Sequence, residues 1–211
     1  MTIVWLIRHG ESEANAGIRV LENATTNLTT KGREQAHLIP QVFDKQPPSL
    51  IVTSPYIRTK QTAEPTIRRF PSTPQVEWLI QEFSFLSRER RRNTTLTERR
   101  PMSADYWSKC DPLYVDGDGA ESFTDMIERV QDFRYKAGEL DEQLVAVFTH
   151  ETFIRAFLWS TLTNTTKIDS RAMSRFRAFM KSLKVPNCGI IKLEFRDSEI
   201  WLNGIVTSHL N

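Results

Sequence analysis

The feature that most constrains the fold is an uninterrupted apolar run near the start of the chain. Residues 3–7 are Ile, Val, Trp, Leu and Ile, and such a run with β-branched members is typical of a strand buried on both faces of a parallel sheet. Arg8, His9 and Gly10 follow directly. They would stand at the carboxyl end of the strand, which is the edge where open α/β sheets bind their ligands.

A second apolar run ends in the same way. Residues 144–149 form a near-continuous apolar strand, and His150 follows it. If the two strands are parallel neighbours, His9 and His150 lie in one crevice, because the carboxyl ends of parallel strands meet at the same sheet edge. The two runs together predict a pair of imidazole groups at one site.

A third, shorter apolar run at residues 50–53 adds a second cation to this edge. Ser54 and Pro55 follow it, and we expect a helix that begins at Pro55, a favoured first-turn residue, with Ser54 as its N-cap. Arg58 would then lie in the first turn of that helix and point back toward Arg8. The predicted pocket therefore holds two guanidinium groups beside the two imidazoles.

The rest of the chain alternates between helix and strand patterns. Residues 28–32 introduce a helix that Pro40 is expected to kink or end. Further elements are a short strand at 76–80, a helix that Ser122 opens with a capping box, helices at 151–162 and 170–181, and a closing hairpin formed by 189–195 and 200–202. This alternation predicts a three-layer α/β/α sandwich.

The composition is that of an ordinary globular protein. The chain has 211 residues, 39% of them hydrophobic and 26% charged, and this size predicts one domain over 1–211 with an insertion around 84–118. The net charge of +2 is too small to indicate a nucleic-acid partner. No apolar run approaches the roughly 20 residues of a membrane span, and the amino terminus lacks the basic n-region and the small-residue cleavage site of a signal peptide. We expect a cytoplasmic protein with Cys110 and Cys188 as reduced thiols; the sequence leaves its oligomeric state open.

The predicted insertion is rich in arginine and has little apolar periodicity. Two interpretations stay open: a solvated basic face, or a collar that attracts an anionic substrate. The arginines concerned are Arg88, Arg90, Arg91, Arg92, Arg99 and Arg100.

The predicted pocket suits phosphoryl transfer. Guanidinium groups bind a phosphoryl group and stabilise its negative charge during transfer, while a neutral imidazole nitrogen can attack phosphorus. The leaving alkoxide needs a proton, and Glu82, just past the short strand expected at 76–80, is the candidate general acid because a nearby phosphate dianion favours the protonated carboxyl. Glu77 and Glu11 are weaker candidates, and Glu11 could equally orient His9.

These residues belong to a longer ordered set that resembles the histidine phosphatase superfamily, also called the phosphoglycerate mutase-like proteins. Beyond Arg8, His9 and Arg58, the set comprises Gly10, Glu11, Asn15, Leu28, Thr29, Gly32, Gln35, Ala36, Thr53, Ser54, Pro55, Thr62, Ala63, Glu121, Ser122, Arg129, His150, Asn187, Cys188 and Gly189. The motif Arg8-His9-Gly10 alone is a weak match, whereas the ordered set covers most of the chain.

The resemblance implies a role for each site residue. His9 would be the nucleophile that forms a phosphohistidine, and Arg8, Arg58 and His150 would complete the phosphate pocket. Asn15 and the backbone amide of Glu151 would contact phosphate oxygens, and Glu82 would be the proton donor. The resemblance also implies that no metal or other cofactor is required, and that the helices enclose a mostly parallel sheet with an antiparallel edge strand.

Two departures from the family pattern stand out. The family usually has glycine directly after its second histidine, where this chain has Glu151. We expect this side chain to turn to solvent from its helix N-terminus; if it points inward, activity is weakened or the preferred substrate altered. After Glu82, residues 83–86 lack the glycine-and-tryptophan pattern common in the family's phosphatases.

Four functions are compatible with these observations. The first is a metal-independent phosphatase that hydrolyses a small phosphorylated substrate. A mutase acting on a phosphorylated glycerate would use the same chemistry, and a phosphate-binding module would have lost it. A zinc hydrolase would use His9, His150 and a carboxylate as ligands, but the neighbouring Arg8 and Arg58 would repel the metal.

Overall fold

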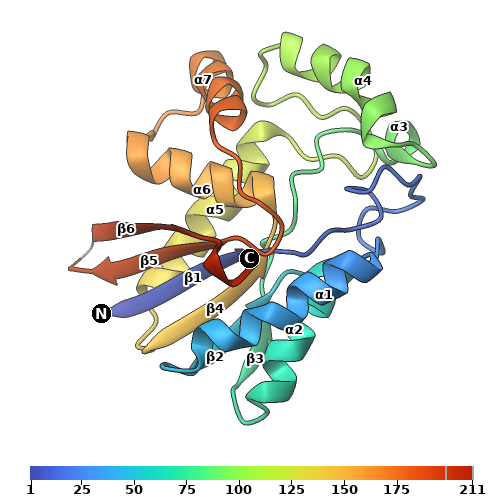
Figure 1. Ribbon diagram of the computed structural model, residues 1–211. Helices are drawn as coiled ribbons and strands as arrows, with labels where there is room; N and C mark the ends of the chain where they lie inside the picture. Colours follow the sequence, from blue (N-terminus) through green and yellow to red (C-terminus); the bar gives the residue numbers. More distant parts are fainter. Residues whose placement is uncertain (198, 211) are drawn as a thin grey trace.

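The strands of the computed structural model, which describes residues 1–197 and 199–210, form one six-stranded sheet (Figure 1). The strands are β1 (Thr2–Arg8), β2 (Leu50–Thr53), β3 (Gln75–Glu77), β4 (Leu144–Thr149), β5 (Ile190–Arg196) and β6 (Glu199–Val206), in the spatial order β3-β2-β4-β1-β5-β6. Neighbours from β3 to β1 are parallel, while β5 is antiparallel to β1 and β6 to β5. The predicted mostly parallel sheet with an antiparallel edge is confirmed.

The register of β1 against β4 places the two histidines side by side. The pairing runs from Ile3 opposite Leu144 to Arg8 opposite Thr149. Both strands end at this last pair, so the residues that follow, His9 and His150, leave the sheet at the same level.

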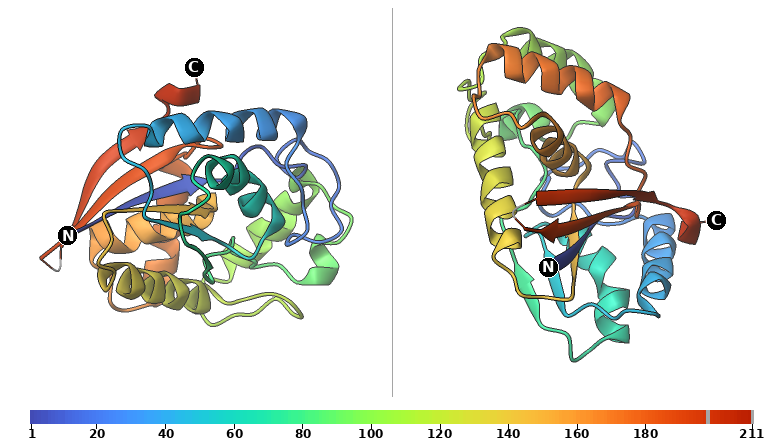
Figure 2. Two further views of the ribbon diagram at one scale, coloured as in Figure 1. Left: turned by 90° about the horizontal axis from the view of Figure 1, so that it is seen from below. Right: turned by 90° about the vertical axis from the view of Figure 1, so that its left-hand side faces the viewer.

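Helices cover both faces of the sheet (Figure 2). On one face lie α1 (Thr30–Leu38) and α2 (Ile57–Arg69); on the other lie α5 (Phe123–Gly138) and α6 (Glu151–Thr163), with α7 (Ser170–Ser182) packed outside α6. Successive residues of β1 face opposite layers, as the period of a strand requires. Trp5 and Ile7 belong to the core under α1 and α2, and Val4 and Leu6 to the core under α5 and α6.

Three element boundaries differ from the sequence prediction or refine it. The first helix ends at Leu38 and continues as a 3₁₀ turn, η1 (Ile39–Phe43); Pro40 has no N–H to continue the α-helical bonding. Helix α2 begins at Ile57 rather than at Pro55. Its N-cap residue is Tyr56, which makes no side-chain capping bond, so the prediction that Ser54 is the N-cap was wrong. The third strand is shorter than predicted and ends at Glu77.

The segment 84–118 forms a helical wall beyond the carboxyl ends of the parallel strands (Figure 1). It contains α3 (Arg88–Arg91) and α4 (Leu96–Ser108), and α4 buries Tyr106 and Trp107. The loop after β1 reaches this wall through a bridge between Val20 and Thr94. The chain ends near η2 (Ser208–Leu210). No helix in the described ranges has the length and apolar character to cross a membrane.

Candidate active site

The two histidines face each other across one guanidinium group. Their ring centroids are 5.2 Å apart. The guanidinium of Arg58 donates from Nε to Nε2 of His9 at 3.1 Å and from Nη2 to Nδ1 of His150 at 3.0 Å. Its Nη1 donates to the carbonyl of Asn23 at 2.6 Å. All three side chains are at least 96% buried, since their exposed fractions are 3%, 4% and 0% for His9, Arg58 and His150.

These contacts define which ring nitrogen carries the proton. A guanidinium only donates, so Nε2 of His9 and Nδ1 of His150 both accept. The other nitrogens must then be protonated: Nδ1 of His9 donates to the carbonyl of Gly10 at 2.7 Å, and Nε2 of His150 donates to Oγ of Ser54 at 2.7 Å. The lone pair of His9 therefore lies on Nε2, the nitrogen that faces Arg58 and His150.

The surroundings keep both rings neutral. Burial first, and then the charges of Arg58 and Arg8, hold the pKa of His9 well below its usual value. The pKa of His150 is lowered in the same way, by burial first and then by Arg58. Burial also lowers the pKa of Arg58 to about 10, so the guanidinium is charged at neutral pH. The site thus combines a neutral imidazole base with a buried cation.

Glu151 does not turn to solvent, and the prediction for this side chain was wrong. Its Oε2 lies 3.1 Å from Nη1 of Arg8, while its Oε1 pairs with Arg155 and accepts from the backbone N–H of Val185 at 3.3 Å. The Glu151 side chain is only 19% exposed. Arg8 also donates to the carbonyl of Val185 at 2.6 Å. A carboxylate therefore occupies one side of the predicted phosphate pocket.

Arg8 nevertheless keeps a donor for another ligand. Its Nε is buried and has no hydrogen-bond partner among the residues that the structure describes. A buried N–H without an acceptor is costly. An anion bound between Arg8 and Arg58 would supply that acceptor.

Gly10 is required by a close approach of two backbone segments rather than by a tight turn. A Cβ built on Gly10 would lie 2.4 Å from the carbonyl oxygen of Gly32, and one built on Gly32 would lie 2.0 Å from that of Glu11. The N–H of Gly10 donates to Oγ1 of Thr62 at 3.1 Å. Helices α1 and α2 thus hold the loop that carries His9.

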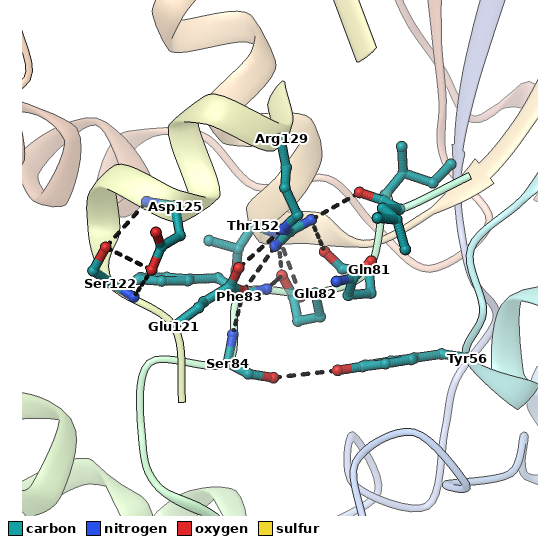
Figure 3. Close-up of polar contacts among 12 residues, drawn as sticks. Tyr56, Gln81, Glu82, Phe83, Ser84, Glu121, Ser122, Asp125, Arg129 and Thr152 are labelled. Atoms are coloured by element: carbon teal, nitrogen blue, oxygen red, sulfur yellow. Dashed lines mark hydrogen bonds and ion pairs between the residues drawn. The ribbon is translucent and has the colours of Figure 1, made fainter. Parts of the chain in front are cut away.

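Glu82 lies at the N-terminus of α6, beside the histidine cluster. Its Oε1 accepts from the backbone N–H groups of Phe83 at 3.0 Å and Thr152 at 3.1 Å. Figure 3 shows how its loop is held: Arg129 reaches from α5 and pairs through two nitrogens with Glu121, at 2.7 and 2.9 Å. The same guanidinium donates to the carbonyls of Leu79 and Gln81, on the segment leading to Glu82. Arg129 therefore positions the candidate acid.

The remaining predicted residues separate into two groups. Asn15 is near the site, with its Oδ1 accepting from the backbone N–H of Ser12 at 3.2 Å and from Asn187 at 3.2 Å. The two weaker acid candidates contact other residues: Glu11 bonds Thr29 and Lys31, and Glu77 pairs with Lys60. Glu11 makes no hydrogen bond to the His9 ring within the described chain, so the geometry gives no support to an orienting role.

Some residues of the site were not predicted from the sequence to take part in it. Ser54 was expected to cap a helix and instead binds His150. Asn187 donates to the backbone carbonyl of His9 at 3.0 Å, and its signal was its place beside Cys188 and Gly189 in the ordered set. Arg155 had only one signal, its position four residues after Glu151, which allows an ion pair on one helix face.

The described part of the chain contains no group of three or more His, Cys, Asp or Glu side chains placed to hold a metal ion. Arg58 lies between the two imidazoles, where a shared zinc ion would have to bind, and it donates to both of them. The arrangement of these side chains therefore fits an anion better than a cation.

An α/β sandwich that presents two histidines and an arginine at the carboxyl ends of β1 and β4, with a second arginine from the first turn of α2, defines a class of phosphoryl-transfer proteins. The model of the histidine phosphatase superfamily (branch 1) matches residues 4–207. The chain belongs to this family.

Individual relatives agree with this assignment. The probable phosphoglycerate mutase GpmB of Serratia proteamaculans is 41% identical over 64 residues, 30% of either chain. The adenosylcobalamin/alpha-ribazole phosphatase of Salmonella typhi is 28% identical over 128 residues, which is 60% of this chain and 63% of the relative. Both are thus matched over less than two thirds of their length. The structure of a phosphoserine phosphatase from Entamoeba histolytica, in complex with 3-phosphoglyceric acid, superposes with a TM-score of 0.74 at 21% identity over the full length of both chains.

Proposed function

We propose that this protein is a metal-independent phosphatase that hydrolyses a small phosphomonoester through a phosphohistidine on His9. The observation that carries the proposal is the lone pair of a neutral His9 Nε2, which faces a second neutral imidazole and a buried guanidinium. The unpartnered Nε of Arg8 adds a donor beside it. A neutral nucleophile surrounded by donors suits attack on a phosphate group.

The first half-reaction transfers the phosphoryl group to His9. When the phosphate enters, Arg58 turns its Nε–H from His9 to a phosphate oxygen, which frees the lone pair. Nε2 attacks phosphorus as the bond to the leaving oxygen breaks, and the carboxyl group of Glu82 gives that oxygen its proton. Arg8 and Arg58 stabilise the charge on the equatorial oxygens, and His150, whose Nδ1 accepts from Nη2 of Arg58, holds that guanidinium in place.

The second half-reaction restores the enzyme. The carboxylate of Glu82 takes a proton from a water molecule as the water oxygen attacks the phosphohistidine. The N–P bond breaks, its electron pair returns to Nε2 of His9, and phosphate leaves. Glu82 is again protonated, so one water molecule is consumed per ester hydrolysed.

Substitution of His9 tests the proposal. His9→Asn should lower phosphate release from a panel of phosphorylated metabolites by at least about a thousandfold, as removal of a nucleophile does in other covalent enzymes. His37→Asn is the matched control, because His37 is exposed on α1. A chelator should leave the rate unchanged. Full turnover by His9→Asn would refute the nucleophile.

The names of the relatives keep a mutase as a second candidate. The Serratia relative is named a probable phosphoglycerate mutase, and such a reaction would return the phosphoryl group to the substrate instead of to water. Incubation with 3-phosphoglycerate separates the two: free phosphate indicates a phosphatase, and 2-phosphoglycerate indicates a mutase.

The ion pair between Glu151 and Arg8 supports a third candidate, a phosphate-binding module with weakened catalysis. The carboxylate competes with phosphate for the same guanidinium. Trapping a phosphorylated His9 by rapid quench after mixing with substrate would exclude this candidate, whereas tight phosphate binding without turnover would favour it.

A further inference from the structure

A large cavity lies beside the candidate acid and is not needed to bind a phosphate group. Its volume is about 490 Å³, within the range of sites that hold a drug-sized ligand. Glu82 and Thr152 line it, and so does Asn23, whose carbonyl accepts from Arg58 of the histidine cluster. Arg155, the partner of Glu151, lines it as well. A leaving group whose oxygen takes its proton from Glu82 would extend into this space.

The inner wall of the cavity is apolar and largely aromatic. Phe83, Phe85 and Trp107 line it together with Leu86 and Met180. The three aromatic rings contact one another, with the centroids of Phe85 lying 5.3 Å from Phe83 and 5.9 Å from Trp107. Phe83 and Trp107 are only 4% and 5% exposed, so the apolar surface open to a ligand lies over Phe85, Met180 and the exposed Leu96. A ring of the leaving group would cover this surface.

The cavity is also lined by cations whose charge has no counter-ion. Arg91, Arg99 and Arg100 come from the segment 84–118, and Arg177 and Lys181 come from α7. Across the described ranges, none of these five side chains takes part in a salt bridge, although Arg88 and Arg90 beside them pair with Glu22, Asp105, Asp116 and Asp118. Glu82 is the one acidic residue among those that line the cavity.

Two of these cations are held in place by neutral oxygens. Arg91 donates to the carbonyl of Gly119 at 2.9 Å, and Arg99 donates to Oγ1 of Thr94 at 2.8 Å. Burial lowers the pKa of both guanidinium groups, and the nearby carboxylates, Glu22 and Glu121 for Arg91 and Glu98 for Arg99, offset that effect only in part. The structure therefore maintains positive charge at the cavity at a cost in stability, which a bound anion would offset.

We propose that the substrate is a phosphomonoester whose leaving group carries both an aromatic or similarly apolar ring system and a second anionic group. The ring would pack on Phe85 and Met180, and the second anion, a phosphate or a carboxylate, would lie toward Arg177 and Lys181. This inference rests on the proposed function for the orientation of the ester, but the cavity itself can be tested by binding alone.

Three ligands that are phosphorylated on the same sugar oxygen test the ring and the second anionic group separately. Ribose 5-phosphate has neither feature, adenosine 5′-monophosphate adds a ring, and adenosine 3′,5′-bisphosphate adds a second anion. Their dissociation constants are measured by calorimetry on the His9→Asn protein, which cannot turn them over. Each addition should tighten binding by about tenfold, from ring burial in the first step and charge-assisted hydrogen bonds in the second.

Arg177→Gln, made in the same His9→Asn background, should remove most of the tenfold gain from the second phosphate. Arg175→Gln is the matched control on the same helix, because Arg175 is exposed and does not line the cavity. Equal dissociation constants for the three ligands, or a bisphosphate gain that survives Arg177→Gln, would overturn the inference. Phosphate release by the wild-type protein is measured separately, so that a binding protein without activity is told apart from an enzyme with a different substrate.

Discussion

The neutral state of the two buried histidines predicts a specific dependence of stability on pH. The perturbation is a change of pH from 7.5 to 5.5, applied to the wild type and to the double variant His9→Asn/His150→Asn. Both rings have pKa values held well below the usual 6.5 by burial and by Arg58. In the unfolded chain they would titrate near that usual value.

The direction in which the free energy of unfolding changes with pH follows from proton binding. Below about pH 6.5 the unfolded state binds protons that the folded state excludes, so the free energy of unfolding rises with pH in that range and falls as the solution is acidified. The stability is fully present above pH 6.5. Between pH 7.5 and 5.5 the free energy of unfolding should fall by roughly 1 kcal/mol for each histidine that stays neutral in the folded state, and by about 3 kcal/mol for the pair.

The assay is equilibrium unfolding in urea at both pH values. The carboxylates, His37 and His209 are present in both proteins, so their contributions cancel when the two pH-induced losses are subtracted. The free energy of unfolding of the wild type should fall by about 3 kcal/mol more than that of the double variant. An equal loss in the two proteins would show that the rings take up protons in the folded state, and the assignment of neutral tautomers would be wrong.

Three further substitutions test other parts of the site. Glu151→Gln should lower the inhibition constant of inorganic phosphate by about tenfold, because it removes a charge that competes for Arg8, while exposed Glu128→Gln should not; an unchanged constant in both would contradict the competition. Gly32→Ala should reduce the free energy of unfolding by about 3 kcal/mol, since its Cβ would lie 2.0 Å from the Glu11 carbonyl. Gly138→Ala, whose Cβ comes no closer than 3.9 Å to Phe195, is the control in that unfolding measurement. Equal losses of unfolding free energy in the two variants would refute the packing argument. Arg129→Lys should lower kcat/KM for an alkyl phosphate about tenfold more than for 4-nitrophenyl phosphate, because only the alkoxide depends on the proton from Glu82; equal losses would show that Arg129 does not position the acid.

The parts of the site that follow from strand ends could be predicted from the sequence. A buried parallel strand is recognisable from its apolar run, and parallel neighbours necessarily share an edge. Arg8, His9 and His150 each adjoin such a run. Arg58 lies in the first turn of the helix that follows another such run. The structure brings all four together: Arg58 contacts both histidines, and the charge of Arg8 acts on His9 and on Arg58.

The wall of the cavity could not be predicted in the same way. Arg177 and Lys181 lie about 80 residues along the chain from Arg99 and Arg100, and nothing in the local pattern of α7 distinguishes a side chain that lines the cavity from one in solvent. Arg88 and Arg90 belong to the same basic stretch as Arg91, yet they pair with carboxylates. Tertiary packing decides which cations stay without a counter-ion. Paired arginines fit the interpretation of a solvated basic face, and unpaired arginines that line the cavity fit a collar that attracts an anionic substrate.

The orientation of Glu151 shows where local reasoning stops. A carboxylate in the first turn of a helix is stabilised by the helix dipole whether it points inward or outward, so the dipole does not choose between the two. The choice is made by Arg8 and Arg155, which together with the N–H of Val185 satisfy both carboxylate oxygens. In the proposed reaction Glu151 would act as the counter-ion of Arg8 until a phosphate dianion replaced it. Because this exchange takes place as the substrate binds, its cost should fall on the affinity for phosphate more than on the transfer of the phosphoryl group to His9.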